Sequence, residues 1–258
     1  MKRWKIIVAI LAAPASIASA NQGYDIAVEA DRRHSGYGDS EAEVIMTLIN
    51  KNGDEDRRKL TVKELEGGTA TDNDKSLMSF NHPRDIAGTA LLTWSVPGKD
   101  DLQWLYLPAI KRVKAISSSN RSGAFMGSEF TFEDLSPQDV DDYEYEYLGE
   151  KELNGELCFV YERRPKDRDS GYTKEVLWVD QSEYRTRQVH FYDHKNEHTK
   201  TLTLIGYELY NDEFWRPSEL FMENHETGRK TRMAFSDYQF GQGLRDSDFN
   251  RSQLRYGR

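Results

Sequence analysis

The sequence predicts a mainly β protein, in which one long antiparallel meander curls into a barrel or half-barrel. Two observations favour this fold class. Strand-like runs recur along most of the chain, and short turns with Asn-Gly pairs, Asn52-Gly53 and Asn154-Gly155, separate several of them. Because Asn and Gly tolerate positive φ angles, such pairs favour tight hairpins between antiparallel neighbours. The regular alternation of strands and helices that a parallel sheet requires is missing.

The N-terminus has the features of a cleavable secretory signal peptide. Lys2, Arg3 and Lys5 precede an apolar run at residues 6–13, and Ala18-Ser19-Ala20 is a small-residue cleavage site. The run is shorter than the roughly 20 apolar residues of a membrane span, so residues 1–20 are predicted to be removed after export. Residues 21–258 then form a single domain.

The remaining elements follow from residue pattern. Tyr24–His34 is predicted as an amphipathic helix, and His82–Ile86 as one helical turn with proline near its start. Phe132–Leu135 and Asp246–Leu254 are predicted as short turns or helices. The alternation of apolar and polar residues with period two predicts the strands, and it allows the strand at residues 44–49 to be covered on both faces. The predicted strands are Val44–Ile49, Lys59–Leu65, Ser76–Phe80, Thr89–Trp94, Leu102–Leu107, Val113–Ile116, Tyr143–Tyr147, Glu156–Arg163, Glu175–Val179, Arg187–Tyr192, Lys200–Tyr210, Glu213–Met222 and Lys230–Tyr238.

Charge and cysteine content exclude several classes of protein. The chain has a net charge of −9, and loss of the three basic leader residues makes the mature charge about −12. Phosphate groups would be repelled by such a chain, so nucleic acid is not an expected partner. Cys158 is the one cysteine. It is expected to be a buried structural thiol, since an internal disulfide is excluded.

The sequence contains no recognisable catalytic set, and no enzyme activity or cofactor is predicted. Gly127-Ser128-Glu129 lacks the nucleophile elbow, and Glu133 and Asp134 are adjacent, so their side chains are expected to point apart. His190, His194 and His198, together with Asp193, could form a metal site at a hairpin tip. A turn of solvated polar residues explains the same residues and is preferred, so no metal is predicted.

Residues 104–135 combine an apolar, basic first half with a glycine- and serine-rich second half. Lys111, Arg112, Lys114 and Arg121 alternate with apolar side chains in the first half. Two interpretations remain open for these residues. They form either an edge strand that lysine protects against aggregation, or a cationic rim beside an apolar opening, which suits an amphiphile with an anionic head group.

Two stretches, PRDIAGTALLTW at residues 83–94 and DLQWLYLPAIKRVKAISSSNRSGAFMGSEFTFEDL at residues 101–135, resemble the exported outer-membrane lipoprotein-sorting-type family, which is related in fold to the lipoprotein carrier LolA and its receptor LolB. Looser agreement extends this resemblance over nearly all of the mature chain. It implies a half-open antiparallel β-barrel with short helices closing the mouth, and an apolar concave face that receives acyl chains. It also implies a periplasmic location, often beside an inner-membrane transporter of the RND type.

The leading hypothesis is therefore a periplasmic carrier of a lipid or of lipoprotein acyl chains. Phe125 and Met126, between Gly123 and Gly127, are predicted to form a movable apolar flap. The alternative is an accessory subunit that docks on the transporter and has a filled core. The predicted ligand-binding wall and flap are Leu91, Trp94, Trp104, Tyr106, Ile110, Val113, Phe125, Met126 and Phe130, and the predicted head-group rim is Lys111, Arg112 and Arg121.

Overall fold

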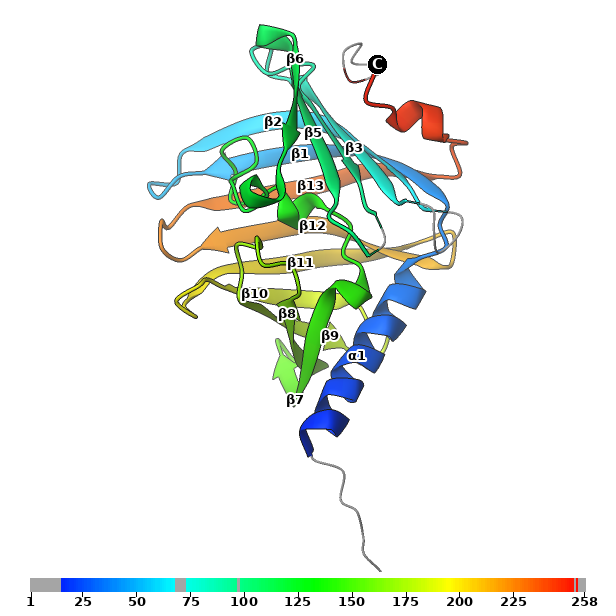
Figure 1. The fold of residues 1–258 in the computed structure, drawn as a ribbon, viewed down its shortest axis with the longest axis vertical. Coiled ribbons are helices and arrows are strands. Elements are labelled where there is room, and N and C mark those ends of the chain that lie inside the picture. The colour runs from blue at the N-terminus through cyan, green and yellow to red at the C-terminus, as the bar shows by residue number, and fades with distance from the viewer. Residues whose placement is uncertain (1–14, 68–72, 97, 253, 255–258) are drawn as a thin grey trace, which may run out of the picture.

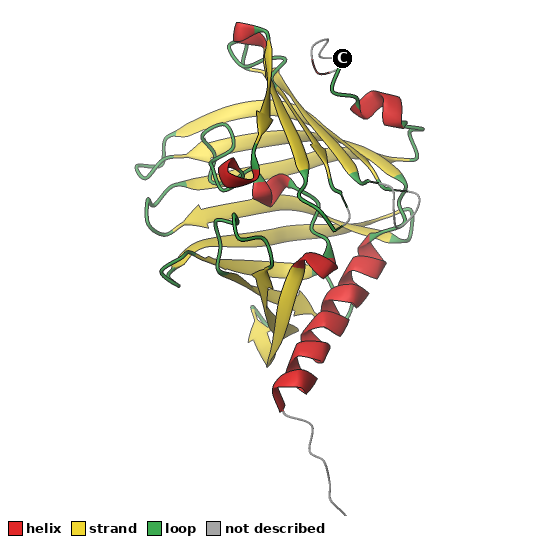
Figure 2. Ribbon diagram, viewed as in Figure 1, coloured by secondary structure: helices red, strands yellow, loops and turns green. Residues whose placement is uncertain are grey.

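The computed structural model describes residues 15–67, 73–96, 98–252 and 254, and this part of the chain forms one curved antiparallel sheet of 13 strands (Figures 1 and 2). The spatial order is β6-β5-β4-β3-β2-β1-β13-β12-β11-β10-β9-β8-β7. All 13 predicted strands are present, and the half-open barrel is confirmed. The strands are β1 (Asp39–Ile49), β2 (Glu55–Leu65), β3 (Lys75–His82), β4 (Ala90–Trp94), β5 (Leu102–Leu107), β6 (Arg112–Ile116), β7 (Tyr143–Leu153), β8 (Glu156–Pro165), β9 (Lys174–Asp180), β10 (Thr186–Tyr192), β11 (His198–Tyr210), β12 (Phe214–Asn224) and β13 (Lys230–Phe240).

The strand order decides where the longest connection runs. β1 pairs with β13, so the two ends of the meander meet in the middle of the sheet. β6 and β7 are consecutive in the sequence but form the two opposite edges. The connection between them, residues 117–142, therefore has to cross from one edge to the other. Figure 1 shows it passing in front of the concave face. It carries the 3-10 helices η2 (Ser118–Asn120), η3 (Glu133–Leu135) and η4 (Val140–Asp142), while η1 (Pro108–Ile110) precedes β6 and η5 (Asp246–Phe249) follows β13.

The helix α1 (Ala15–His34) packs against the edge strand β7. Tyr24 and Tyr145 make an edge-to-face contact with ring centroids 5.7 Å apart. A side chain at Gly23 would lie only 3.2 Å from the backbone nitrogen of Tyr147, so glycine permits this close approach. The helix begins earlier than the predicted Tyr24. Of the predicted signal peptide, residues 1–14 lie outside the described residues. No described helix has the length and hydropathy of a membrane span.

Apolar side chains gather in two clusters on opposite faces of the sheet. The larger one lines the concave face, where Met46, Leu60, Met222 and Met233 are almost completely buried. The smaller one lies on the convex face of β3–β5 and joins Ala90 and Leu92 to Phe249 and Leu254 of the C-terminal segment. Strands β3–β5 are thus covered on both faces. The residue pattern also allowed such a double covering for the strand at residues 44–49, but Ile45 of β1 is 40% exposed.

The predicted turns form with one exception. Asn154 and Gly155 both have positive φ angles, as a tight hairpin requires, whereas only Gly53 does so in the Asn52-Gly53 pair. The single helical turn predicted at residues 82–86 is present but begins one residue later, since His82 ends β3. The amides of Ile86 and Ala87 both donate to the carbonyl of Pro83, and the turn is not continued as a helix.

The C-terminal segment should contribute measurably to stability. Phe249 is completely buried against β4, and its carbonyl accepts a 2.9 Å hydrogen bond from the Trp94 indole. We expect Phe249→Ala to lower the free energy of unfolding by about 3–5 kcal/mol, because it leaves a cavity on the convex face. Urea denaturation measures this loss. The control Leu157→Ala, at a side chain that is 49% exposed, should change the value by less than about 0.5 kcal/mol. A similarly small loss for Phe249→Ala would contradict the packing.

Candidate functional site

A buried loop within the β6–β7 connection fills part of the concave face. We name residues 123–132 the plug. Phe125 and Phe130 are 0% and 1% exposed, and Phe125 packs between Phe80 and Phe132 with ring centroids 5.7 and 5.6 Å away. The segment predicted as a flap therefore lies against the sheet, with its aromatic side chains inside the half-barrel.

Polar contacts centred on Glu129 hold the plug to strands β11–β13. One carboxylate oxygen of Glu129 accepts a 2.7 Å hydrogen bond from the Asn224 amide, and the other lies 3.1 Å from Nε of Arg229. The Glu129 amide donates to the Thr231 hydroxyl, and its carbonyl accepts from Nζ of Lys200, both at 2.9 Å. We name these contacts the latch. Charge-assisted bonds of this kind are the stronger ones in proteins, so the latch fixes the plug in place.

The tip of the plug is strained and is held by two arginines. Met126 has a φ of 50° and Gly127 a φ of 77°. For methionine this left-handed conformation costs about 1–2 kcal/mol. The Met126 carbonyl accepts a 2.5 Å hydrogen bond from Arg58, and the Gly127 carbonyl accepts one of 2.7 Å from Arg229. These bonds offset the strain only while the plug is seated.

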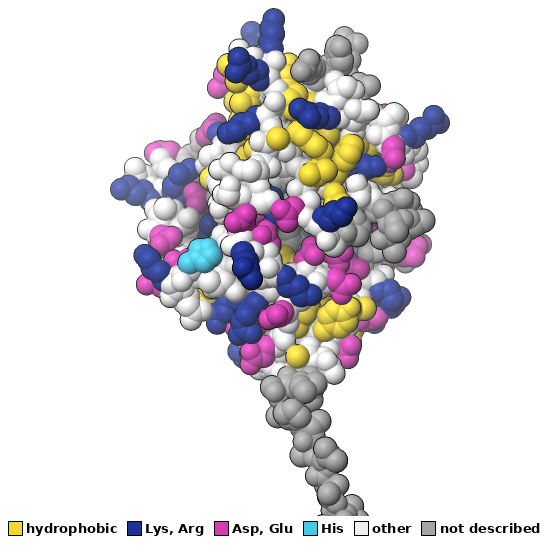
Figure 3. All heavy atoms as spheres, viewed as in Figure 1, with side chains coloured by type: hydrophobic (Ala, Val, Ile, Leu, Met, Phe, Trp, Pro, Cys, Tyr) yellow, Lys and Arg dark blue, Asp and Glu magenta, His cyan; other side chains and the backbone are white. Residues whose placement is uncertain are grey.

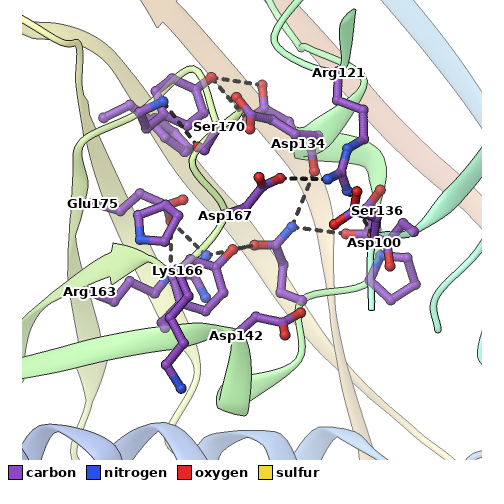
Figure 4. A pocket seen from close by; sticks show the side chains of 18 of the residues that line it. Asp100, Arg121, Asp134, Ser136, Asp142, Arg163, Lys166, Asp167, Ser170 and Glu175 are labelled. Atoms are coloured by element: carbon purple, nitrogen blue, oxygen red, sulfur yellow. Dashed lines mark hydrogen bonds and ion pairs between the residues drawn. The ribbon is translucent and has the colours of Figure 1, made fainter. Parts of the chain in front are cut away.

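A cavity of about 370 Å³ lies beside the plug (Figure 4). Its floor is apolar and consists of Val189 and Phe191 on β10 and Leu202 on β11. Its walls come from residues 98–101, from residues 133–143 and from the β8–β9 connection. This volume is near the lower end of the roughly 300–1,000 Å³ of small-molecule sites. The half-barrel is thus neither solid nor fully hollow.

Charged side chains line this cavity, and acidic ones outnumber basic ones by seven to four. Figure 3 shows carboxylates gathered near the middle of the same face of the molecule. The acidic residues are Asp100, Asp101, Glu133, Asp134, Asp142, Asp167 and Glu175, and the basic residues are Lys99, Arg121, Arg163 and Lys166.

The two arginines of the cavity are already paired with carboxylates. Arg121 lies 2.5 Å from Asp167 and 3.8 Å from Asp101. Arg163 lies 2.6 Å from Glu175, which is almost completely buried. Because a buried ion pair keeps its arginine occupied, neither guanidinium is free to neutralise a further anion.

Glu133 and Asp134 bind different partners but line the same cavity. Glu133 accepts a 3.0 Å hydrogen bond from the Gly171 amide, and Asp134 accepts one of 3.0 Å from the Tyr172 hydroxyl. Burial, followed by the charge of Asp134, raises the pKa of Glu133 to about 7. Desolvation disfavours the charged form of a carboxyl group, which explains the direction of this shift. Because the two residues are adjacent in the sequence, their side chains were expected to point apart, but in the structure both side chains line the same cavity.

The residues predicted as one ligand-binding wall are divided between the two faces. Leu91, Phe125 and Phe130 belong to the concave cluster, and Met126 packs against it. Trp94, Trp104, Tyr106 and Val113 instead belong to the convex cluster around Phe249. The physical reason is the alternation of side chains along a strand, which sends neighbours such as Leu91 and Leu92 to opposite faces. Those four residues therefore lie outside the concave wall to which they were assigned.

The predicted head-group rim is not assembled at the cavity. Arg121 lines the cavity, whereas Lys111 and Arg112 are exposed at the start of β6. Lys111 adopts a left-handed conformation that ends η1, and Ile110 beside it is 59% exposed. These residues form a separate basic and apolar surface at one edge of the sheet.

The histidines do not form the considered metal site. The rings of His190 and His198 stack with centroids 4.2 Å apart, while His194 turns away and places Nε2 3.2 Å from the Ser170 carbonyl. Burial and the neighbouring histidines lower the pKa of His190 to about 4. Among the described residues, the group of three possible ligands whose ligand atoms all lie within 4.8 Å of one another is instead Asp193, Glu197 and Glu226.

Cys158 is completely buried, as predicted for a structural thiol. Its pKa is raised to about 11, chiefly by burial and secondarily by the charge of Glu156. A thiol with a raised pKa is a poor nucleophile.

Residue patterns did not reveal the cavity, because its polar residues come from loops. Asp101, Gln138, Asp142 and Lys166 are distant in the sequence and meet only at the mouth. The sequence feature that could have indicated the cavity is the dense run of carboxylates at residues 133–142. An acidic segment that crosses the concave face borders any opening on that face.

Replacing Glu133 should stabilise the protein in a pH-dependent way. A carboxyl group with a raised pKa takes up protons on folding, so it destabilises the fold increasingly as the pH rises from 4.5 to about 7. Its neighbours are Asp134, Ser170, Glu175 and the Gly171 amide. We expect the melting temperature of Glu133→Gln to exceed the parent's by a margin that grows between about pH 5 and pH 8.

Glu150→Gln, at an exposed position on β7, is the matched control for thermal denaturation at both pH values. The margin of Glu133→Gln over the parent should grow with pH relative to that of this control. A margin for Glu133→Gln that is the same at both pH values would contradict the raised pKa of Glu133.

Comparison with known proteins supports the fold and assigns a family. A family model described as an uncharacterized protein matches residues 72–256. A crystal structure of an outer membrane lipoprotein-sorting protein domain from Vibrio parahaemolyticus is 45% identical, covers 92% of this chain and 99% of its own, and has a TM-score of 0.88. A DUF1329 family protein from Desulfovibrio piger is 31% identical, with the same coverages and a TM-score of 0.86.

A more distant structure, a LolA superfamily protein from Nitrosomonas europaea, is 21% identical, covers 89% of this chain and 98% of its own, and has a TM-score of 0.72. At this identity the likeness concerns the fold alone. No curated protein matches the sequence. The resemblance drawn from residues 83–94 and 101–135 is confirmed. The chain belongs to the DUF1329 family and has the fold of the LolA superfamily.

Proposed function

We propose that this protein is a periplasmic carrier that binds a lipid, or the acyl chain of a lipoprotein, on the concave face of its half-barrel. The observation that carries the proposal is the cavity, which reaches from a polar mouth to an apolar floor at Val189, Phe191 and Leu202. Amphiphiles have the same polarity, with one polar end and one apolar end. The relatives from Vibrio parahaemolyticus and Nitrosomonas europaea support a carrier class through their fold.

The cavity is too small for two acyl chains while the plug is seated. Moving the plug would expose Phe125, Phe130 and Phe132, which are all buried. Each phenylalanine loses roughly 1.5–3 kcal/mol on exposure, and each buried methylene of a ligand recovers about 0.8 kcal/mol. About six to eleven methylenes would therefore offset the loss. An acyl chain of ordinary length is sufficient, and the near balance keeps binding reversible.

The periplasmic location follows from the predicted signal peptide. Cleavage after Ala20 would remove Ser19, whose hydroxyl donates a 2.8 Å hydrogen bond to the Tyr147 carbonyl. The contacts of Gly23, Tyr24, Ile26 and Ala27 with β7 and the concave cluster would remain. The helix would thus keep its packing in the mature protein.

Direct binding measurements test the carrier function. Delipidated mature protein should take up a fluorescent fatty acid saturably, because the apolar floor excludes water from the chain. Native mass spectrometry should show the added mass of one ligand. A protein that remains empty with fatty acid, lysolipid and phospholipid alike would contradict the proposal.

Weakening the latch should accelerate loading. Arg229→Gln removes the ion pair with Glu129 and the hydrogen bond to Gly127, so the plug opens more easily. We expect the rate of fatty-acid uptake, measured by stopped-flow fluorescence, to rise about tenfold for a latch contribution of about 1.4 kcal/mol. Arg232→Gln, which loses an ion pair with Glu219 on β12, is the matched control and should leave the rate unchanged. Equal rates for both variants would show that the plug does not gate uptake.

A second candidate function is docking on an RND-type inner-membrane transporter. The observation in its favour is the edge surface at the start of β6, where Ile110 is 59% exposed beside the exposed Lys111 and Arg112. Solvent-exposed apolar residues rimmed by charge are typical of protein interaction sites. Capture of a transporter that is lost in Ile110→Ser but independent of bound lipid would favour docking over carriage.

A further inference from the structure

We infer that the cavity selects an amphiphile whose head group is a protonated amine. This preference presupposes the proposed carrier function and adds the chemical class of its cargo. It reverses the anionic head group that the basic stretch at residues 111–121 suggested.

The cavity has carboxylates left over after its ion pairs are counted. Arg121 is paired with Asp167 and Asp101, and Arg163 is paired with Glu175. Lys166 donates to a backbone carbonyl, that of Asp141. Glu133, Asp134 and Asp142 line the cavity, and none of the described basic side chains lies within ion-pair distance of them. Four carboxylates of the cavity, those of Asp100, Glu133, Asp134 and Asp142, thus remain against two lysines, Lys99 and Lys166.

Burial raises the free energy of the unpaired negative charges in the cavity. The pKa of Glu133 is raised to about 7 by burial and by Asp134. The pKa of Asp142 is raised by burial, then by Asp139 and Asp101. Both shifts mean that the site tolerates a second negative charge poorly. A bound ammonium group would relieve the repulsion, whereas a carboxylate or phosphate would increase it.

Aromatic rings are placed to continue the site below the charged mouth. Tyr143 and Tyr172 line the cavity, and the rings of Tyr172 and Phe191 have centroids 4.7 Å apart. The Arg163 guanidinium already lies 4.2 Å from the centre of the Tyr143 ring. Cations are attracted to such ring faces, and an alkyl chain gains from covering them.

One buried hydrogen-bond donor of the cavity lining lacks an acceptor, and a ligand oxygen would supply it. The Arg121 side chain is 9% exposed and lines the cavity, and its Nε has no hydrogen-bond partner among the described residues. A buried donor without a partner costs about 1–3 kcal/mol. A head group with an oxygen beside the amine, as in an ethanolamine unit, would supply both the cation and this acceptor.

A series of amphiphiles with one chain length tests the head group. Dodecylammonium, dodecanoate and dodecyl maltoside are titrated into the delipidated mature protein by calorimetry, below their micelle concentrations. We expect dodecylammonium to bind at least about tenfold more tightly than dodecanoate. Dodecanoate binding as tightly or more tightly would overturn the amine preference and leave the carrier function standing. Failure of all three to bind would instead contradict the carrier function itself.

Ethanolamine, which has the amine and the oxygen but no alkyl chain, separates a lipid from a small soluble amine. Its binding should be much weaker than that of dodecylammonium. Equal affinity would overturn the assignment to an amphiphile.

Paired charge variants test whether the cavity itself makes the selection. Glu133→Gln combined with Asp142→Asn should reduce the preference for dodecylammonium over dodecanoate about tenfold or more, while the affinity for dodecyl maltoside stays within about twofold and so reports an intact site. The control pair Glu150→Gln and Glu152→Gln makes the same change in net charge on exposed β7 positions. Equal losses in both pairs would show a long-range effect of net charge and would overturn the site.

Discussion

The concave face of the half-barrel has to be covered, and this constraint organises the rest of the molecule. An open sheet of 13 antiparallel strands leaves β6 and β7 as unpaired edges, so the barrel wall cannot close over its own apolar interior. Burying that interior is the dominant favourable term in the stability of such a fold. The chain meets the requirement with its longest connection, which must cross from one edge to the other and carries Phe125, Phe130 and Phe132 into the curve of the sheet.

The same surface that the plug covers is the surface a carrier would offer to its cargo. In the proposed function, plug and acyl chain would compete for it, and similar apolar areas would make the exchange nearly balanced. The latch around Glu129 adds an ion pair and hydrogen bonds that stabilise the seated plug beyond its apolar contacts. In the proposed function, a lipid that displaces the plug would have to overcome both.

Charge is distributed unevenly over this fold, and the distribution separates two surfaces. Seven acidic and four basic side chains line the cavity, and this excess is the basis of the proposed preference for a cationic head group. The surface around Lys111 and Arg112 is basic and partly apolar, and it lies at the β6 edge of the sheet. A cargo site and a partner site with opposite charge would each discourage the ligand of the other.

The sequence by itself determined the 13 strands, because alternating residues and turn-forming pairs such as Asn154-Gly155 are local signals. The stretch at residues 83–135 was also sufficient to indicate the family. Only the tertiary structure decided which face each strand residue occupies. Strands β3–β5 are covered on both faces, so neighbouring residues such as Leu91 and Leu92 are both apolar. Without an alternation of apolar and polar residues, the sequence does not show which side chains face the concave side of the sheet. The cavity was likewise decided by tertiary structure. Most of its carboxylates come from separate loops, and these loops are brought together by the curvature of the sheet, not by any spacing along the chain.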